Sequence, residues 1–244
     1  RRHLARAAIW LLLPLLAAAQ SLQDFQKRVT EFTLPNGLHF IVLERHQAPV
    51  VSFHTYVNAG AVDDPGGKTG LAHMFEHMAF KGTQTIGATN YPEEKKALDA
   101  IEAVYDKLDA ERDPARIQAL EGELKAAIEK AGGYVDQNAY PRIIEENGGV
   151  GLNAGTGEDS TSYFYSLPSN RIELWFYMES QRFLAPVFRE FYKERDVVRE
   201  ERRMRVESNP QGKALETLLA MTFMASQYRN GPGGWASDIE NLRV

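Results

Sequence analysis

Residues 70–83 read GLAHMFEHMAFKGT and place two histidines, His73 and His77, four positions apart with Glu76 between them. Apolar residues at helical spacing predict a helix over Leu71–Phe80, after a glycine-rich loop over residues 58–70. Residues i and i+4 of a helix lie on one face about one turn apart, so both imidazoles can bind one metal ion. Glu76 lies on the adjoining flank and can reach a water bound to that metal. The alternative is two ordinary helix histidines beside a surface glutamate.

A hydrolytic zinc site needs a third protein ligand and an open position for water. Carboxylates are abundant in residues 190–201, within a charged segment, Phe188–Glu207, that we predict to be one long helix ended by Asn209-Pro210. Glu194 and Glu201 are seven residues apart, which puts them on nearly the same face. Glu200 is rotated by about 100° from Glu201.

This spacing favours Glu194 and Glu201 as an inward-facing pair, with Val197 and Val198 between them on the buried side. One carboxylate would bind the metal, and the other would orient a histidine or the water from outside the ligand sphere. A solvated charged helix is the alternative, and it is a serious one for Glu200.

The composition excludes several classes of protein. Hydrophobic residues make up 43% and charged residues 25% of the 244 residues, as in ordinary globular proteins. The absence of cysteine excludes disulfides, iron–sulfur clusters and thiol nucleophiles, so His, Asp or Glu must hold any metal. The net charge of −5 gives no sign of a nucleic-acid partner.

The N-terminus has the layout of a secretory signal peptide over residues 1–19. Three arginines precede the ten-residue apolar run Ala7–Leu16, and Ala17-Ala18-Ala19 offers a cleavage site before Gln20. The run is too short to span a bilayer comfortably, although a membrane anchor or a buried helix remains the alternative. We therefore expect an acidic domain over residues 20–244, periplasmic or secreted, with no stable membrane anchor once the signal is removed.

The remaining segments combine strands with helices. Residues 93–131 are charged and alanine-rich with apolar residues at helical spacing, and Asp113-Pro114 interrupts them, which predicts a mostly solvated helical hairpin. The other predicted elements are a β-hairpin over 28–34 and 38–44, strands over 50–57 and 160–167, helices over 171–183 and 214–228, and a helix start at 237–238.

Four ordered blocks give the chain a family resemblance. They are Gly70–Thr83, GLNAGTGEDSTSY at Gly151–Tyr163, ERDVVREERRM at Glu194–Met204, and GWASDIENL at Gly234–Leu242. With them the sequence resembles the pitrilysin, insulinase and mitochondrial processing peptidase family of zinc peptidases, which carry the inverted H-x-x-E-H motif.

The resemblance implies a role for each matching position. His73, His77 and Glu201 would bind one zinc ion per chain, Glu76 would be the general base, and Glu194 would be the supporting carboxylate. A peptide substrate would add as a β-strand beside Asn153, Ala154, Gly155 and Thr156. A plain turn residue is the alternative for Asn153.

The resemblance also implies an α+β fold, with a mixed or antiparallel β-sheet and helices packed on one face. Two departures stand out. The 124 residues from His77 to Glu201 exceed the family's usual gap, which marks the helical hairpin at about 93–131 as an insertion. The resemblance also implies a second homologous domain, which we expect to lie outside this chain. We expect a zinc-dependent endopeptidase acting on peptides or unfolded polypeptides, completed by a second domain or subunit. The alternative is a non-catalytic or partner-dependent subunit of a two-chain peptidase that binds peptide.

Overall fold

The computed structural model describes residues 25–244, which divide into two compact units between Pro49 and Val50. The predicted signal peptide lies outside the described residues. The first unit is the predicted β-hairpin, in which β1 (Val29–Thr33) pairs antiparallel with β2 (His39–Leu43). Gly37 takes a left-handed conformation (φ 88°) in the turn, and the Leu38 N–H donates to Asn36 Oδ1. Gly favours this tight turn because it tolerates positive φ, and Asn36 favours it because its side chain accepts a hydrogen bond from the backbone two residues on.

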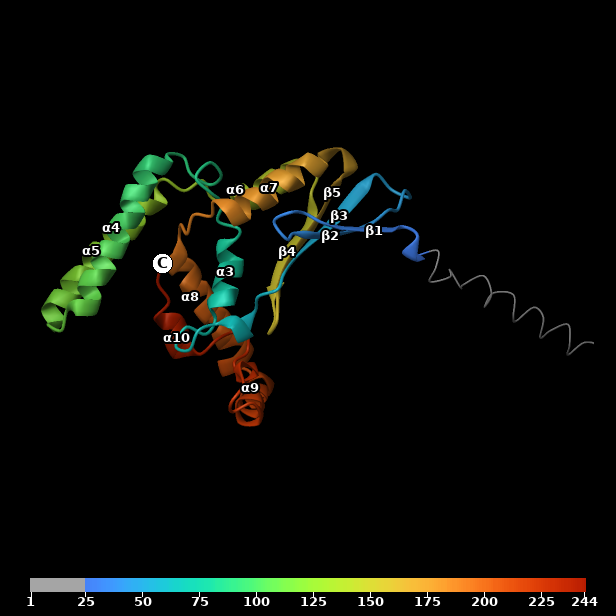
Figure 1. Cartoon of the computed structure of the whole chain (residues 1–244). Coiled ribbons are helices and arrows are strands. Elements are labelled where there is room, and N and C mark those ends of the chain that lie inside the picture. The colour runs from blue at the N-terminus through green and yellow to red at the C-terminus, as the bar shows by residue number, and fades with distance from the viewer. Residues whose placement is uncertain (1–24) are drawn as a thin grey trace, which may run out of the picture. The chain divides into compact units, whose positions relative to one another are not determined.

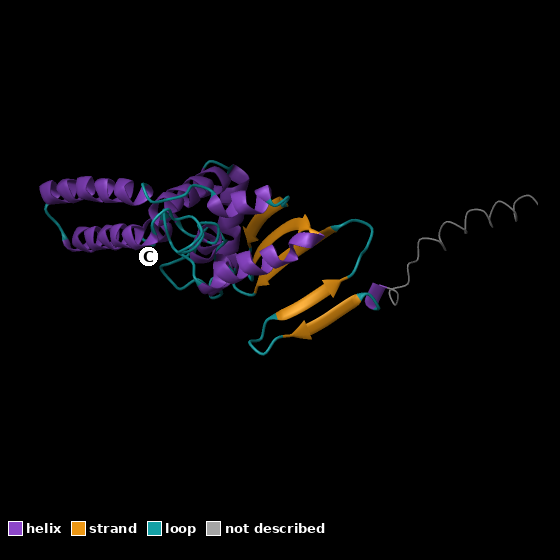
Figure 2. Cartoon of the chain, turned by 90° about the horizontal axis from the view of Figure 1, so that it is seen from above, coloured by secondary structure: helices purple, strands orange, loops and turns teal. Residues whose placement is uncertain are grey.

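The second unit contains the three-stranded antiparallel sheet β3-β5-β4 and the helices (Figures 1 and 2). Its strands are β3 (Val50–Val57), β4 (Val150–Thr156) and β5 (Thr161–Pro168). Its α-helices are α3 (Leu71–Met78), α4 (Tyr91–Ala110), α5 (Pro114–Gly132), α6 (Ala139–Glu146), α7 (Ile172–Leu184), α8 (Phe191–Arg202), α9 (Pro210–Thr222) and α10 (Ala236–Glu240).

Helices cover one face of this sheet. Tyr163, Tyr165 and Leu167 of β5 are buried, whereas Phe164 between them is exposed on the other face. The buried face packs against Tyr140 of α6 and Met178 of α7, and α3 also contacts β4 and β5. This alternation with period two is what a half-covered sheet requires. The predicted α+β class, with antiparallel strands and helices on one face, is confirmed.

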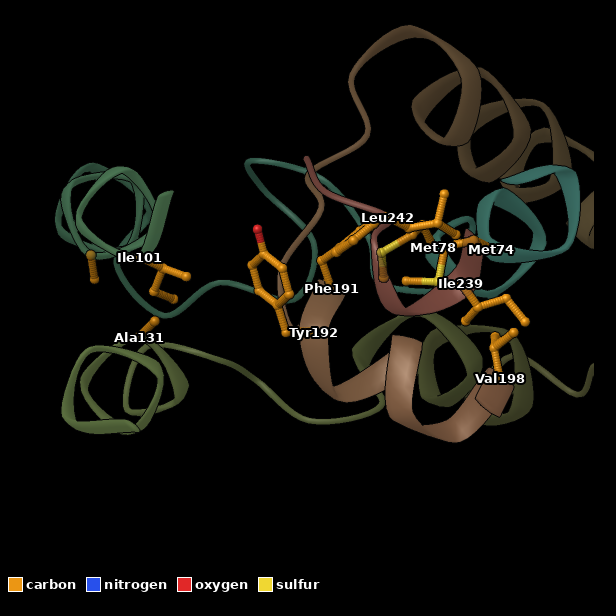
Figure 3. Close-up of a cluster of buried hydrophobic side chains, with 10 residues drawn as sticks. Met74, Met78, Ile101, Ala131, Phe191, Tyr192, Val198, Ile239 and Leu242 are labelled. Atoms are coloured by element: carbon orange, nitrogen blue, oxygen red, sulfur yellow. The ribbon is translucent and has the colours of Figure 1, made fainter. Parts of the chain in front are cut away.

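A second hydrophobic cluster joins α3 to α8, although the two helices are more than a hundred residues apart in sequence (Figure 3). Met74 and Met78 of α3 pack with the fully buried Val198 of α8. Ile239 and Leu242, near the C-terminus, complete the contact. The cluster fixes the distance between the His-bearing helix and the Glu-bearing helix.

The predicted helical hairpin is formed by α4 and α5, which run antiparallel (Figure 2). Asp113 accepts hydrogen bonds from the N–H groups of Ala115 and Arg116 and so caps α5. Tyr105, in the second half of α4, stacks on Tyr192 of α8, with ring centroids 4.0 Å apart. This stacking attaches the hairpin to α8.

Three sequence expectations were wrong in detail. The helix predicted from Phe188 begins at Phe191, because Glu190 adopts a left-handed conformation (φ 57°). The helix predicted over 214–228 spans Pro210–Thr222 instead, since Asn209 caps it and proline is well placed in a first helical turn. Val197 is 40% exposed, so Val198 alone of the two valines is buried.

A buried ion pair anchors the loop that follows α3. The side chains of Arg189 and Glu94 are 1% and 0% exposed, and Arg189 Nε donates to Glu94 Oε1 over 2.7 Å. The same guanidinium donates to the carbonyl oxygens of Thr83 and Ile86. The pair thereby joins residues 83–86, α4 and the segment before α8.

Glu94→Gln should destabilise the chain by about 3 kcal/mol, because it leaves the buried Arg189 charge without its carboxylate. The measurement is the free energy of unfolding in urea. Glu93→Gln, one residue earlier on the exposed side, is the matched control and should leave the midpoint nearly unchanged. Equal midpoints for the two variants would show that the buried pair does not stabilise the fold.

Within residues 25–244, none of the helices combines the length and the apolar character that a membrane crossing requires.

Candidate metal centre

Helix α3 is fixed at its N-terminus by contacts from the preceding loop and from a segment near the C-terminus. Asp64 is buried and accepts hydrogen bonds from the N–H groups of Gly70 (2.7 Å) and Ala72 (2.9 Å). Thr69 Oγ1 donates to Asp238 Oδ2 over 2.7 Å, so the Gly234–Leu242 block is attached to the start of this helix. Four N–H groups at a helix start lack partners within the helix, and the Asp64 carboxylate accepts from two of them. The helix therefore has a defined position and rotation.

The structure brings together His73, His77 and Glu201, as the sequence predicts. The two Nε2 atoms are 3.3 Å apart. Glu201 Oε2 lies 3.7 Å from His73 Nε2, and Glu201 Oε1 lies 3.9 Å from His77 Nε2. One nitrogen or oxygen atom from each of these three residues lies within 4.8 Å of the other two, close enough to bind one metal ion.

This donor set fits a zinc ion. Two ligands about 2.0–2.1 Å from one tetrahedral zinc lie about 3.3–3.4 Å apart, which matches the separation of the two imidazole nitrogens. The Glu201 oxygens are slightly farther away, 3.7 Å and 3.9 Å from the two imidazole nitrogens. Glu201 Oε2 is buried and makes no hydrogen bond, although the Arg205 guanidinium lies 3.2 Å away, so this oxygen remains available as a metal ligand. Burial and the neighbouring His77 lower the pKa of His73, which keeps its imidazole neutral, as a ligand must be.

Glu76 lies one residue before His77 but outside this ligand group. Thr156 Oγ1, on β4, donates to Glu76 Oε2 over 2.6 Å. The hydrogen bond holds the carboxylate beside the histidines and against the last residue of β4, which is an edge strand among the described residues.

Glu194 contacts His77 on the side away from the ligand nitrogens. Its Oε2 lies 3.2 Å from His77 Nδ1, and its Oε1 lies 2.6 Å from Lys81 Nζ. Burial would raise the pKa of the Glu194 carboxyl, but hydrogen bonds from His77 and Lys81 outweigh it and hold the pKa below its usual value. The ionised carboxylate can therefore fix the imidazole with Nε2 free for a metal.

Glu200 takes no part in the site. Its side chain is 51% exposed and pairs with Arg203 on the outer surface of α8. The helix geometry thus separates Glu201 from Glu200, as the spacing predicts.

The site opens into a cavity of about 380 Å³. Asn153, Ala154 and Thr156 of β4 line it together with His73 and Glu76. The alternative of a turn residue at Asn153 was wrong, because Asn153 lies inside a strand.

Two basic residues at the site were missed from the sequence. Lys81 pairs with Glu194 and with Glu190, and Arg205 lies 3.2 Å from Glu201 Oε2. Arg205 is four residues after Glu201, so helical spacing could have indicated it. Lys81 belongs to the Gly70–Thr83 block but follows the end of α3.

The chain is similar to proteases of known sequence or structure. It is 25% identical over 233 residues to the zinc protease PqqE of Helicobacter pylori, a match that covers 94% of this chain and 41% of that protein. A crystal structure of a protease from Helicobacter pylori superimposes with a TM-score of 0.60 at 22% identity, covering 88% of this chain and 40% of that one. The periplasmic protease PqqL from Escherichia coli gives 0.60 at 18% identity, covering 89% and 19%. The chain thus spans less than half the length of each.

A model of the family described as Insulinase (Peptidase family M16) matches residues 40–110 and 125–232. These segments comprise most of the chain and include both histidines, Glu76 and Glu201. The residues between them, 111–124, include the tip of the α4–α5 hairpin. The chain therefore belongs to the insulinase family of peptidases, family M16.

Proposed function

We propose that this chain is the zinc-binding catalytic part of an endopeptidase that hydrolyses peptides or unfolded polypeptides. One observation carries the proposal: His73, His77 and Glu201 converge on one point, and Glu76 lies between that point and the edge strand β4. A donor set that fits zinc, a carboxylate beside it and an exposed strand edge are the components of a hydrolytic peptide site.

Glu76 would act as the general base. Its carboxylate takes a proton from the attacking water and later passes it to the leaving amine. Thr156 donates to one carboxylate oxygen and so leaves the other for the water. When bound, zinc would lower the pKa of that water and polarise the scissile carbonyl.

The substrate would add to β4 at Asn153, Ala154 and Thr156. In the described part of the chain β4 is an edge strand, since the sheet order is β3-β5-β4. The Ala154 N–H donates to Asn153 Oδ1 over 2.9 Å. A peptide that pairs with this N–H would therefore replace the Asn153 side chain as its acceptor. Main-chain pairing would give affinity with loose sequence preference.

We further propose that the catalytic domain spans residues 20–244, that the hairpin over about 93–131 is an insertion, and that a second homologous domain or subunit helps to bind substrate. The greater length of the matched relatives supports the last point. A periplasmic or secreted location is supported by the N-terminal sequence and by the similarity to a periplasmic protease.

The test is the metal content of the purified chain and its cleavage of a quenched peptide library, before and after chelation and re-addition of zinc. One zinc per chain with zinc-dependent cleavage supports the proposal. Zinc without cleavage would favour the partner-dependent subunit. A chain that binds no zinc would contradict the proposed function.

Glu194→Gln should weaken zinc binding by about 10–100-fold, because outer-shell partners of ligand histidines have effects of that size. The amide keeps the shape but loses the charge that pairs with Lys81 and orients His77. Zinc affinity is measured by competition with a chromogenic chelator. Asp196→Asn, an exposed acidic residue on the same helix, is the control. An unchanged affinity in Glu194→Gln would exclude an orienting role for Glu194.

A further inference from the structure

Arg205 is the one lysine or arginine side chain among the residues that line the cavity of the candidate metal centre. It lies on the π-helical turn Arg203–Glu207 that continues α8. Its side chain is 71% exposed, and it reaches back to Glu201, with an N–O distance of 3.2 Å. Among the described residues, no carboxylate other than that of Glu201 lies within ion-pair distance of this guanidinium.

The neighbouring arginines have other partners. Arg203 pairs with Glu200 on the outer surface. Arg202 is buried and pairs with Glu216 over 2.8 Å. Arg205 therefore differs from both, because its charge faces the cavity and its acidic partner is a proposed metal ligand.

The net charge of the site with zinc bound is the sum of the charges of its ligands and the ion. Two neutral imidazoles, one carboxylate and a divalent ion carry a net charge of about +1. Glu76 offsets this charge, so the positive charge of Arg205 remains in excess beside the edge strand. When Glu201 binds a metal ion, less of its negative charge would be available to pair with the Arg205 guanidinium. The planar guanidinium then matches a second carboxylate in charge and in bidentate geometry.

We propose that Arg205 is a specificity-determining residue that binds a carboxylate of the peptide substrate. The inference rests on the proposed function of the site and adds a substrate class to it: peptides with an anionic group close to the scissile bond. That group is either an acidic side chain or the free C-terminal carboxylate. Residues 153–156 of β4 line the same cavity, so a peptide paired with β4 passes within reach of Arg205.

The test compares quenched peptides that differ only in Asp, Asn or Lys at positions flanking the cleaved bond. Wild type should prefer Asp over Asn by roughly tenfold in kcat/KM, mainly through KM, as expected for a charge-assisted hydrogen bond. Arg205→Gln should abolish the preference, and Arg205→Lys should retain part of it. Arg203→Gln, on the same turn but outside the cavity, is the matched control and should behave as wild type. The preference should also weaken as salt rises.

A second readout does not depend on turnover. The same peptides, labelled with a fluorophore, are titrated into Glu76→Gln and into the Glu76→Gln, Arg205→Gln double variant, and binding is followed by anisotropy. The proposal is supported if the Asp peptide binds more tightly than the Asn peptide to Glu76→Gln but not to the double variant. This result does not require cleavage, so it can be distinguished from a failure of the proposed function. Free and amidated C-termini distinguish the two sources of the carboxylate. Equal binding of Asp and Asn peptides to both variants, with no effect of amidation, would overturn the proposal, and so would the absence of any binding.

Discussion

Glu76→Gln should lower kcat/KM for peptide cleavage by about 10²–10⁴-fold, the usual contribution of a general base, while one zinc per chain remains bound. The amide has nearly the same shape as the carboxylate and can still accept the hydrogen bond from Thr156. It cannot accept a proton from water. Because Glu76 is not among the converging ligand atoms, the substitution removes the base without removing a ligand.

The measurement is single-substrate kinetics together with the zinc content of the same sample. Glu145→Gln, an exposed residue of α6, is the control for loss of one negative charge. Near wild-type turnover in Glu76→Gln would rule out Glu76 as the base. Loss of zinc together with activity would instead assign Glu76 a role in holding the metal.

The second large effect is expected at Glu201. Glu201→Ala should weaken zinc binding by more than the roughly 10–100-fold that is typical of an outer-shell partner, because it removes one of three protein ligands. Activity should fall with the metal. The helix itself should persist, since alanine is a strong helix former.

Glu200→Ala is the matched variant, because it removes a neighbouring carboxylate that is half exposed and faces away from the histidines. It should bind zinc as wild type does. Zinc affinity is measured by chelator competition at equal pH and ionic strength. Equal affinities in the two alanine variants would disprove the assignment of Glu201 as third ligand.

The local parts of the site could be predicted from the sequence. His73 and His77 are four residues apart on one helix, and Glu194 and Glu201 are seven apart on another, so helix geometry alone puts each pair on one face. Strands β1, β2, β3 and β5 and the α4–α5 hairpin were also predictable, because their apolar spacing and turn residues are local signals. Strand β4 was not predicted as a strand, because its glycine-containing sequence lacks that spacing.

The parts that depend on long-range contacts were not predictable. Nothing local to Glu190 indicates its left-handed conformation, which fixes the start of α8. Two contacts join segments about a hundred or more residues apart. They are the buried ion pair of Arg189 with Glu94 and the hydrogen bond from Thr69 to Asp238. Periodicity shows which face of a helix is buried but not which distant group meets it.

The measurement that tests the account most directly is an anomalous difference map at the zinc edge, from crystals of the chain grown with zinc. We expect one strong peak per chain, with His73 Nε2, His77 Nε2 and a Glu201 oxygen about 2.0–2.3 Å from it and Glu194 bonded to His77 but not to the metal. A peak at any other residues, a peak ligated by Glu194 in place of Glu201, or no peak would contradict the proposed centre.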